Sequence, residues 1–177
     1  MTMKPLIHFS HATGMPVPVY RTLLQQLEQH YDVITSPTLG IDQRYPIDAH
    51  WQSLTQQVID SIVTQAQGRK VIGVGHSLGA ALTFLASYQR PELFEQNVLL
   101  DPPLILGMAS LQLHYAKYFN RVMLDKITPA HLSIKRREHW QSREQAGEML
   151  RPKGFYKDFD ERCFQDYLKY ALRDDTV

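Results

Sequence analysis

Length, composition and charge limit the kinds of protein that this sequence can encode. The chain has 177 residues, 44% of them hydrophobic, which suffices for one ordinary domain, or a modest core with a small appendage, but not for two full domains. The 19 Lys and Arg residues against 18 Asp and Glu residues give a formal net charge of +1, so the chain has no strong field of one sign to attract nucleic acid or an anionic membrane. We therefore expect a small, near-neutral molecule as the partner, and no nucleic acid.

The sequence carries no pattern typical of secretion or of membrane insertion. The short apolar stretch near the N-terminus is interrupted by Pro5 and His8, and no run of about 18 apolar residues occurs. The one cysteine, Cys163, has no second cysteine for an internal disulfide and lies outside any spacing that zinc or redox sites use. These features predict a soluble protein of the reducing cytoplasm.

The N-terminal part of the chain alternates between strand-like and helix-like segments. A β-favouring run over residues 6–9 ends in a loop at residues 10–16, where Gly and Pro stop regular structure. Apolar positions with helical spacing follow over residues 17–27, and a second strand-like run over residues 31–35 stops at Pro37. The chain therefore begins with strand, helix and strand.

Two further strands and two further helices follow. A second helix is predicted between Asp48, a capping residue, and Gly68, which stands where a left-handed residue ends a helix. The run at residues 70–75 is apolar without alternation, which is typical of a strand buried on both faces of a parallel sheet. An Ala-rich helix over residues 78–89 leads to a fourth strand at residues 97–100. Four strands alternating with three helices predict a parallel α/β sheet.

After the fourth strand the sequence pattern becomes mostly helical. Apolar spacing over residues 111–123 suggests one helix, while Ser142 begins a capping-box pattern for a second and the run at residues 158–161 opens a third. No further strand of comparable quality follows. We therefore predict a core domain at residues 1–105 and a helical cap or lid segment at residues 106–177.

The strongest chemical signal lies between the third strand and the third helix, where five residues match the pattern G-x-S-x-G: Gly75, His76, Ser77, Leu78 and Gly79. In this strand–turn–helix setting the serine takes a strained backbone conformation that points its hydroxyl out of the sheet. The flanking glycines are needed because a Cβ there would collide with the neighbouring strand or helix. The following helix directs its free N–H groups toward charge that develops near the serine. The motif predicts that Ser77 is a nucleophile.

A second motif, His11-Ala12-Thr13-Gly14 after the first strand, resembles the His-Gly oxyanion loop of α/β-hydrolases, with Ala12 at the usual glycine. Together the two motifs resemble the α/β-hydrolase superfamily over residues 5–101. The resemblance implies a partial α/β-hydrolase fold, an α/β architecture in which a parallel sheet of about four strands is flanked by helices and followed by a helical cap. It also implies that the backbone N–H groups of Thr13 and Leu78 hold the oxyanion, and that Gly75, His76 and Gly79 shape the elbow.

In this family an acid and then a histidine follow the serine, because serine is a poor nucleophile until a base takes its proton. Asp101 is a candidate acid, since some members carry the acid after this strand; its alternative role is in a turn with the two prolines that follow. No histidine is a convincing base, and the ones that follow Asp101 fall in the helical segment: His114, His131 and His139. We therefore expect the chain to stop before the last strands and the catalytic histidine of this fold.

The main functional hypothesis is a serine hydrolase that acts on esters, thioesters or related acyl compounds through Ser77, and it implies no metal and no cofactor. Two alternatives stay open. The first is a catalytically impaired or non-catalytic remnant that lacks the histidine and binds a partner, or itself, through an uncovered sheet edge at residues 97–100. The second is a C–C bond hydrolase or lyase that uses the same fold.

Overall fold

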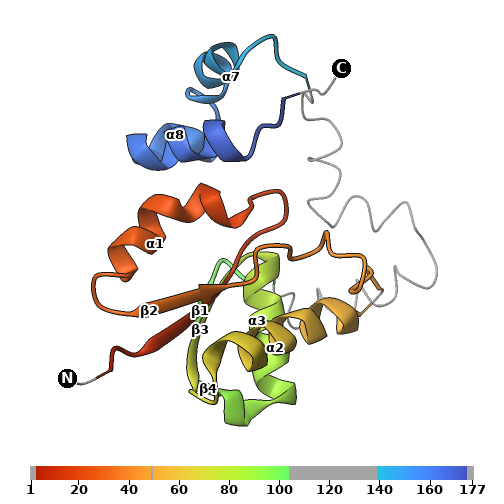
Figure 1. Cartoon of the computed structure of the whole chain (residues 1–177). Coiled ribbons are helices and arrows are strands. Elements are labelled where there is room, and N and C mark those ends of the chain that lie inside the picture. The colour runs from red at the N-terminus through yellow and green to blue at the C-terminus, as the bar shows by residue number, and fades with distance from the viewer. Residues whose placement is uncertain (1–2, 49, 104–138, 175–177) are drawn as a thin grey trace, which may run out of the picture. The chain divides into compact units, whose positions relative to one another are not determined.

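The computed structural model describes residues 3–48, 50–103 and 139–174 (Figure 1). Its elements come in the order β1 (Leu6–Ser10), the 3₁₀ turn η1 (Val17–Tyr20), α1 (Arg21–Leu27), β2 (Asp32–Thr35), α2 (Gln52–Ala66), β3 (Val71–His76), α3 (Leu78–Gln89), η2 (Pro91–Leu93) and β4 (Phe94–Leu100). The described C-terminal elements are α7 (Arg143–Leu150), η3 (Gly154–Asp158) and α8 (Glu161–Tyr170). None of the helices in these ranges is both long and apolar enough to cross a bilayer.

The four strands form one parallel sheet in the order β2-β1-β3-β4. The chain therefore moves outward from β1 in one direction to β2, and in the other direction to β3 and β4. Helices connect the strands, as parallel neighbours require. The predicted fold class, a partial α/β-hydrolase sheet flanked by helices, is confirmed.

Alternating side chains of the strands pack against helices on the two faces of the sheet. On one face Leu6 of β1 joins a buried cluster with side chains of α2 and α3, and on the other Ile7 and Phe9 pack with Leu24 of α1. Figure 1 shows α1 on one side of the sheet and α2 with α3 on the other. Because β1 and β3 are covered on both faces, their residues are almost all buried.

The helix ends follow the predicted capping signals. The Asp48 carboxylate accepts hydrogen bonds from the amides of His50 (2.9 Å), Gln52 (3.0 Å) and Ser53 (2.7 Å), so it caps α2 from a distance, and the regular helix begins only at Gln52. At the other end Gly68 has a φ of +81°, as a C-terminal left-handed residue should. Both predicted signals are confirmed.

One strand is longer than its sequence suggested. β4 begins at Phe94, three residues before the run predicted at residues 97–100. It is the last strand of the described sheet, and its polar residues 95–97 are exposed. A strand without the burial of β1 or β3 does not need a continuous apolar sequence. Because of these polar residues, the sequence pattern did not indicate the first half of β4 as a strand.

The C-terminal helices begin where the sequence predicted them, at the capping box of Ser142 and within residues 158–161. The hydroxyl of Ser142 accepts the amide of Gln145 at 3.2 Å, and the Asp160 carboxylate accepts the amide of Arg162 at 2.9 Å. By their contacts, residues 1–103 and 147–177 form one compact unit and residues 104–146 a second. The helix predicted over residues 111–123 lies outside the described residues, and the division into core and cap stays a prediction.

The helix α8 is attached to α1 through a buried carboxylate. Asp166 is 2% exposed, and it accepts hydrogen bonds from the Arg21 guanidinium (2.9 Å) and from the hydroxyl (2.7 Å) and amide (3.2 Å) of Thr22. Burial raises the pKa of this carboxyl, but the bonds from Thr22 and Arg21 outweigh that effect and leave the pKa below its ordinary value. Asp166 is therefore a charged anchor between two distant parts of the chain.

Candidate functional site

The turn between β3 and α3 holds Ser77 in an unusual backbone conformation. Its φ is +51° and its ψ is −119°, a combination that residues with a side chain rarely adopt. The Ser77 amide donates to the carbonyl oxygen of Leu100 at 2.9 Å, and the Ser77 carbonyl accepts the amides of Ala80 (3.0 Å) and Ala81 (3.2 Å). The serine is thus fixed by its main chain, while its side chain stands at the end of the sheet.

Two glycines allow this sharp turn because neither position has space for a side chain. A Cβ at Gly75 would lie 2.5 Å from the Cα of Ala80 in the first turn of α3. A Cβ at Gly79 would lie 2.5 Å from the carbonyl carbon of Ser10 at the end of β1. The start of α3 is therefore pressed against both β3 and the beginning of the loop that follows β1.

The loop after β1 runs beside the start of α3. Met15 donates its amide to the Ala12 carbonyl at 3.1 Å and Gly14 has a φ of +72°, so residues 12–15 form a tight turn. Within the described ranges neither the amide of Thr13 nor that of Leu78 donates to a protein acceptor. Among the described residues, two backbone donors on neighbouring segments thus have no acceptor at the end of the sheet that carries Ser77.

Tyr20, which the sequence indicated only as a helix packing residue, connects these two segments. Its hydroxyl oxygen accepts the amide of Ala12 at 3.2 Å and lies 2.7 Å from Nδ1 of His76, 56 residues away in the chain. Its ring packs edge-on against Phe9 and His76, with centroid distances of 4.8 and 5.8 Å. Nothing in the spacing of the sequence signalled this contact.

Burial determines the protonation of His76 and Tyr20. Desolvation lowers the pKa of His76 below its ordinary value, although the negative charge of Asp101 opposes the shift. Desolvation likewise raises the pKa of Tyr20 to about 12. Both side chains are therefore uncharged at neutral pH.

Asp101 stands next to the serine turn at the end of β4. The parallel register pairs His76 with Leu100, so the residues that follow, Ser77 and Asp101, lie side by side at the carboxyl ends of β3 and β4. Asp101 is exposed and has a φ of +45°, a conformation that Asp tolerates better than most residues. The structure thus brings the predicted acid to the predicted nucleophile.

The described histidines of residues 3–103 supply no base for Ser77. Within the described ranges none of them forms a hydrogen bond with the Ser77 hydroxyl, and His11 instead bonds through Nδ1 to the Ala12 carbonyl at 2.9 Å. His114 and His131 lie outside the described ranges, and His139 belongs to the second compact unit. The described residues also contain no group of three His, Cys, Asp or Glu side chains that could hold a metal ion.

The position of Ser77 in the sheet is itself informative. The strand order reverses between β1 and β3. The connection from β1 leads to β2 on one side, whereas the connection from β2 crosses to β3 on the other side of β1. Ligands of open parallel α/β sheets bind outside the carboxyl ends of the strands at such a reversal. Ser77 follows β3 and the loop with Thr13 follows β1, so both lie at this point.

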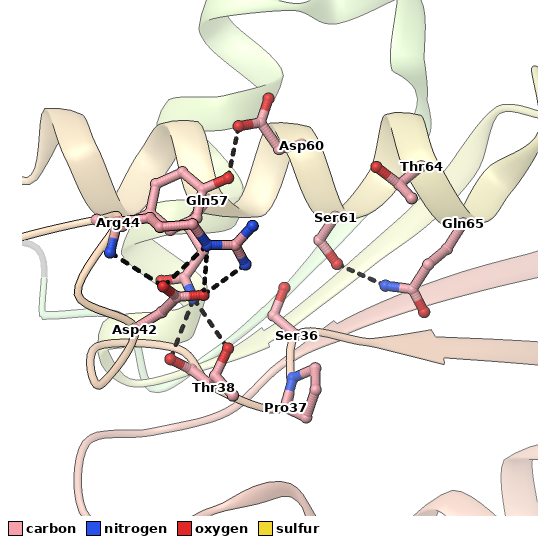
Figure 2. Close-up of a pocket in the computed structure, with 11 residues that line it drawn as sticks. Ser36, Pro37, Thr38, Asp42, Arg44, Gln57, Asp60, Ser61, Thr64 and Gln65 are labelled. Atoms are coloured by element: carbon pink, nitrogen blue, oxygen red, sulfur yellow. Dashed lines mark hydrogen bonds and ion pairs between the residues drawn. The ribbon is translucent and has the colours of Figure 1, made fainter.

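A polar pocket of about 300 Å³ lies away from Ser77, between the segment after β2 and the helix α2 (Figure 2). Arg44 pairs with Asp42 at 2.7 Å, and Asp60 accepts the Tyr45 hydroxyl at 2.7 Å. The Gln57 amide donates to the Thr38 carbonyl at 3.0 Å. Since its charged groups already have partners, these bonds serve to hold the loop on α2.

A second, apolar pocket of about 240 Å³ lies on the face of the sheet that α1 covers. It is lined by side chains of α1 and of three strands, among them Leu23, Ile72, Val98 and Leu100. Val98 is 43% exposed and Leu100 40% exposed. On this face, α1 therefore covers β4 less completely than it covers β1 and β3.

Comparison with known proteins gives a family and its relatives. The model of a family described as "Alpha/beta hydrolase family" matches residues 8–176. The "Type I acyl-CoA thioesterase mpaH" of Penicillium roqueforti is 25% identical over 180 residues, which cover 93% of this chain and 39% of that protein. The "Uncharacterized hydrolase YugF" of Bacillus subtilis is 32% identical over 84 residues, 46% of this chain and 30% of that protein.

Solved structures show the same fold at low identity. A thioesterase domain from the curacin biosynthetic pathway gives a TM-score of 0.58 at 18% identity over 98% of this chain and 61% of that one. A 2-hydroxy-6-oxo-6-phenylhexa-2,4-dienoate hydrolase from a Rhodococcus species gives 0.56 at 15% identity over 96% of this chain and 57% of that one. The chain spans about two fifths of the length of the thioesterases that it matches in sequence.

Proposed function

Because the chain belongs to the α/β-hydrolase family, we propose that it is a serine hydrolase that attacks acyl esters or thioesters with Ser77. The observation that carries this proposal is the backbone of Ser77, whose φ of +51° is maintained between two glycines that cannot accept a side chain. Backbone strain of this kind is costly and persists where the surroundings impose it, typically at functional sites. The proposal has this turn present the hydroxyl at the point of an open parallel sheet where ligands bind.

The proposed reaction has two steps. The Ser77 oxygen attacks the acyl carbonyl carbon, the carbonyl electrons move to its oxygen, and the N–H groups of Thr13 and Leu78 stabilise the resulting oxyanion. The intermediate then collapses, expels the thiolate or alkoxide, and leaves an acyl-Ser77 ester, while a base passes the serine proton to the leaving group. Water hydrolyses the ester, which releases the acid and restores the hydroxyl.

Two features support an acyl thioester among the possible substrates. A relative over nearly the whole chain is named an acyl-CoA thioesterase, and a structural neighbour is a thioesterase domain. The chemistry proposed for Ser77 needs no metal and no cofactor. A thioester is also the more reactive acyl donor, so it demands less activation of the serine than an ester or an amide.

Asp101 is the proposed acid, since its strand register places it beside Ser77. The base is proposed to be a histidine other than those that the structure describes near the serine. The candidates in the chain are His114 and His131, which lie outside the described ranges, and His139 of the second compact unit. Replacing each histidine with alanine tests whether it is the base, because loss of a triad base lowers turnover by about four to six orders of magnitude.

A fluorophosphonate probe tests the proposed nucleophile. We expect the probe to label the chain at one site, and the labelling to be lost in Ser77→Ala but kept in Ser87→Ala, which removes a hydroxyl from the opposite end of α3. Absence of labelling at every pH between 6 and 9 would contradict the proposal. Equal labelling of Ser77→Ala would contradict it as well.

A substrate panel separates acyl transfer from carbon–carbon cleavage on the same fold. Acyl thioesters and esters should react in a manner that depends on Ser77, whereas 1,3-diketones should remain intact. Cleavage of a 1,3-diketone without thioester hydrolysis would instead favour the C–C bond hydrolase. The panel therefore decides between two reactions that share the serine turn.

The exposed end of the sheet favours a second candidate function, self-association through β4. Within the described residues β4 pairs only with β3, and Val98 and Leu100 are exposed beside the apolar pocket. An unpaired strand edge of this kind can add a further strand. Light scattering over a hundredfold concentration range should then show a dimer that Val98→Lys dissociates, whereas a constant monomer would exclude this function.

A further inference from the structure

The hydroxyl of Tyr20 lies between two residues that each precede a residue of the proposed reaction site. Ala12 comes directly before Thr13, the proposed oxyanion donor, and His76 comes directly before Ser77. We propose that Tyr20 is a positioning residue that holds the oxyanion loop and the serine turn at a fixed separation and keeps His76 in its Nε2–H tautomer. This inference rests on the proposed role of Ser77.

The geometry determines which atom holds each proton. The Ala12 amide is a donor and lies 3.2 Å from the Tyr20 oxygen, so the oxygen accepts there. The single Tyr20 proton has two acceptors within reach: Nδ1 of His76 at 2.7 Å, and the Met15 thioether sulfur at 3.7 Å. The nitrogen is the closer and stronger acceptor, since a thioether accepts only weakly. His76 therefore accepts at Nδ1, and its own proton lies on Nε2.

Packing fixes the hydroxyl in this place. The Tyr20 ring lies edge-on to Phe9 of β1 at 4.8 Å and edge-on to His76 of β3 at 5.8 Å. The aromatic ring thus contacts both strands whose carboxyl ends carry the loop and the serine turn. The hydroxyl has little freedom to move without carrying the Ala12 amide or the His76 ring with it.

The charges agree with this arrangement. Among the described residues, two ionisable groups act on the His76 ring, Tyr20 from η1 and Asp101 from the end of β4. The Tyr20 hydroxyl keeps its proton because burial raises its pKa to about 12, and burial lowers the pKa of His76 despite the charge of Asp101. A protonated His76 would carry a hydrogen on Nδ1, and the Tyr20 oxygen would then face two donors. The hydrogen-bond chain needs the neutral histidine.

Tyr20→Phe tests the inference because it removes the hydroxyl and keeps the ring. Tyr31→Phe is the matched control, since Tyr31 packs in the same buried cluster and its hydroxyl makes no hydrogen bond to a described residue. We expect Tyr20→Phe to slow phosphonylation of Ser77 about tenfold at saturating probe, with little change in the half-saturating probe concentration, as for loss of one hydrogen bond that does not touch the probe. Unchanged rates in Tyr20→Phe would overturn the inference while leaving the nucleophile proposal intact.

A second measurement does not depend on activity. Nitrogen-15 NMR of the imidazole rings should show His76 with a bare Nδ1 and a protonated Nε2, its signal being assigned by its absence in a His76 variant. In Tyr20→Phe the pKa of His76 should rise, because the neutral ring loses the bond at Nδ1, and the Ala12 amide should exchange with solvent at least about tenfold faster. A proton on Nδ1 in the wild-type chain, or unchanged Ala12 exchange, would overturn the inference even if Ser77 never reacts.

Substitutions of His76 keep the inference falsifiable if Tyr20→Phe fails to fold. The oxygen of an asparagine side chain can take the place of Nδ1 and accept the Tyr20 proton, whereas leucine cannot. We expect His76→Asn to protect the Ala12 amide about tenfold better than His76→Leu, and to label faster. Equal protection in both variants would contradict the proposed chain of bonds.

Discussion

The backbone of Gly79 lies directly against the backbone of Ser10, so close that a methyl group on Gly79 would stand 2.5 Å from the Ser10 carbonyl carbon. Real side chains do not approach main-chain atoms this closely. The contact joins the first turn of α3 to the end of β1, and with it the serine turn to the loop that carries Thr13. The separation of the two proposed oxyanion donors therefore depends on a residue without a side chain.

Gly79→Ala should destabilise the chain by about 1–3 kcal/mol or more, because the new methyl group must displace main chain rather than a flexible side chain. Gly68→Ala is the control: its φ is +81° but nothing lies within 4 Å of the added Cβ, so we expect a cost of about 1 kcal/mol. Urea unfolding of the two variants measures the difference. A Gly79→Ala chain as stable as Gly68→Ala would show that the contact is looser than described.

His8 should make the fold sensitive to mild acid. Its side chain is fully buried, its Nε2 lies 3.1 Å from the Ser36 hydroxyl and 3.0 Å from that of Ser61, and burial lowers its pKa to about 3. In the unfolded chain the same imidazole titrates near 6.5, so below that pH the unfolded state binds the extra proton and stability falls as pH falls. We expect a loss of up to about 1.4 kcal/mol per pH unit below pH 6 from this residue.

Urea unfolding between pH 7 and 5 measures this slope in a range where carboxylates change little. Replacing His8 with asparagine should lower stability at pH 7 and flatten the slope by about one proton. His11 and His76 also have lowered pKa values and contribute in the same direction. A slope that His8→Asn leaves unchanged would contradict the assignment.

Asp166 should anchor α8 to α1. Asp166→Ala leaves the Thr22 hydroxyl and the Arg21 guanidinium without their buried acceptor, and we expect a loss of about 2–4 kcal/mol together with proteolytic cutting before α8. Glu92→Ala, which breaks an exposed pair with Arg90, should cost less than about 1 kcal/mol. Similar costs for the two changes would argue against the anchor.

The same carboxylate has a predictable pH dependence. Because its pKa is lower in the folded chain than in the unfolded one, its contribution is fully present above the unfolded value of about 3.9 and is lost as pH falls through the lower folded value. Below pH 4 the wild-type chain and Asp166→Ala should therefore converge in stability. Persistence of the full difference at pH 2 would contradict the low pKa.

Asp101 should influence both the neighbouring histidine and the reaction. Asp101→Asn removes a negative charge that favours protonated His76, so the pKa of His76 should fall further, as an NMR titration would show. If Asp101 is also the acid of the reaction, thioester turnover should fall about 10³- to 10⁴-fold. Normal turnover together with a lowered His76 pKa would show that Asp101 acts on the charge of His76 but is not the acid of the reaction.

The sequence predicted most of the fold because its strongest patterns come from burial. The strands β1 and β3 are covered on both faces, so their apolar runs were clear, and capping residues such as Asp48 and Ser142 marked helix starts through their own hydrogen bonds. β4 was found only in part, because the last strand of the described sheet exposes its polar residues 95–97. A single sequence thus predicts the features that residues close together along the chain produce.

The site was predicted where it depends on backbone shape and missed where it depends on distant contacts. The strain at Ser77 and the need for glycine at positions 75 and 79 follow from the turn itself, so the motif revealed them. The contact of Tyr20 with His76 joins residues 56 positions apart, and only the packing of η1 against β3 brings them together. A tyrosine with helical spacing carries no mark of such a bond.

The most direct test of the central claim is peptide mapping after brief reaction with a short-chain acyl thioester and an acid quench. We expect release of the free thiol together with an added acyl mass on the peptide that contains Ser77, and neither in Ser77→Ala. Hydrolysis without any acyl mass on Ser77, or equal thiol release by Ser77→Ala, would contradict the claim that this serine is the attacking residue.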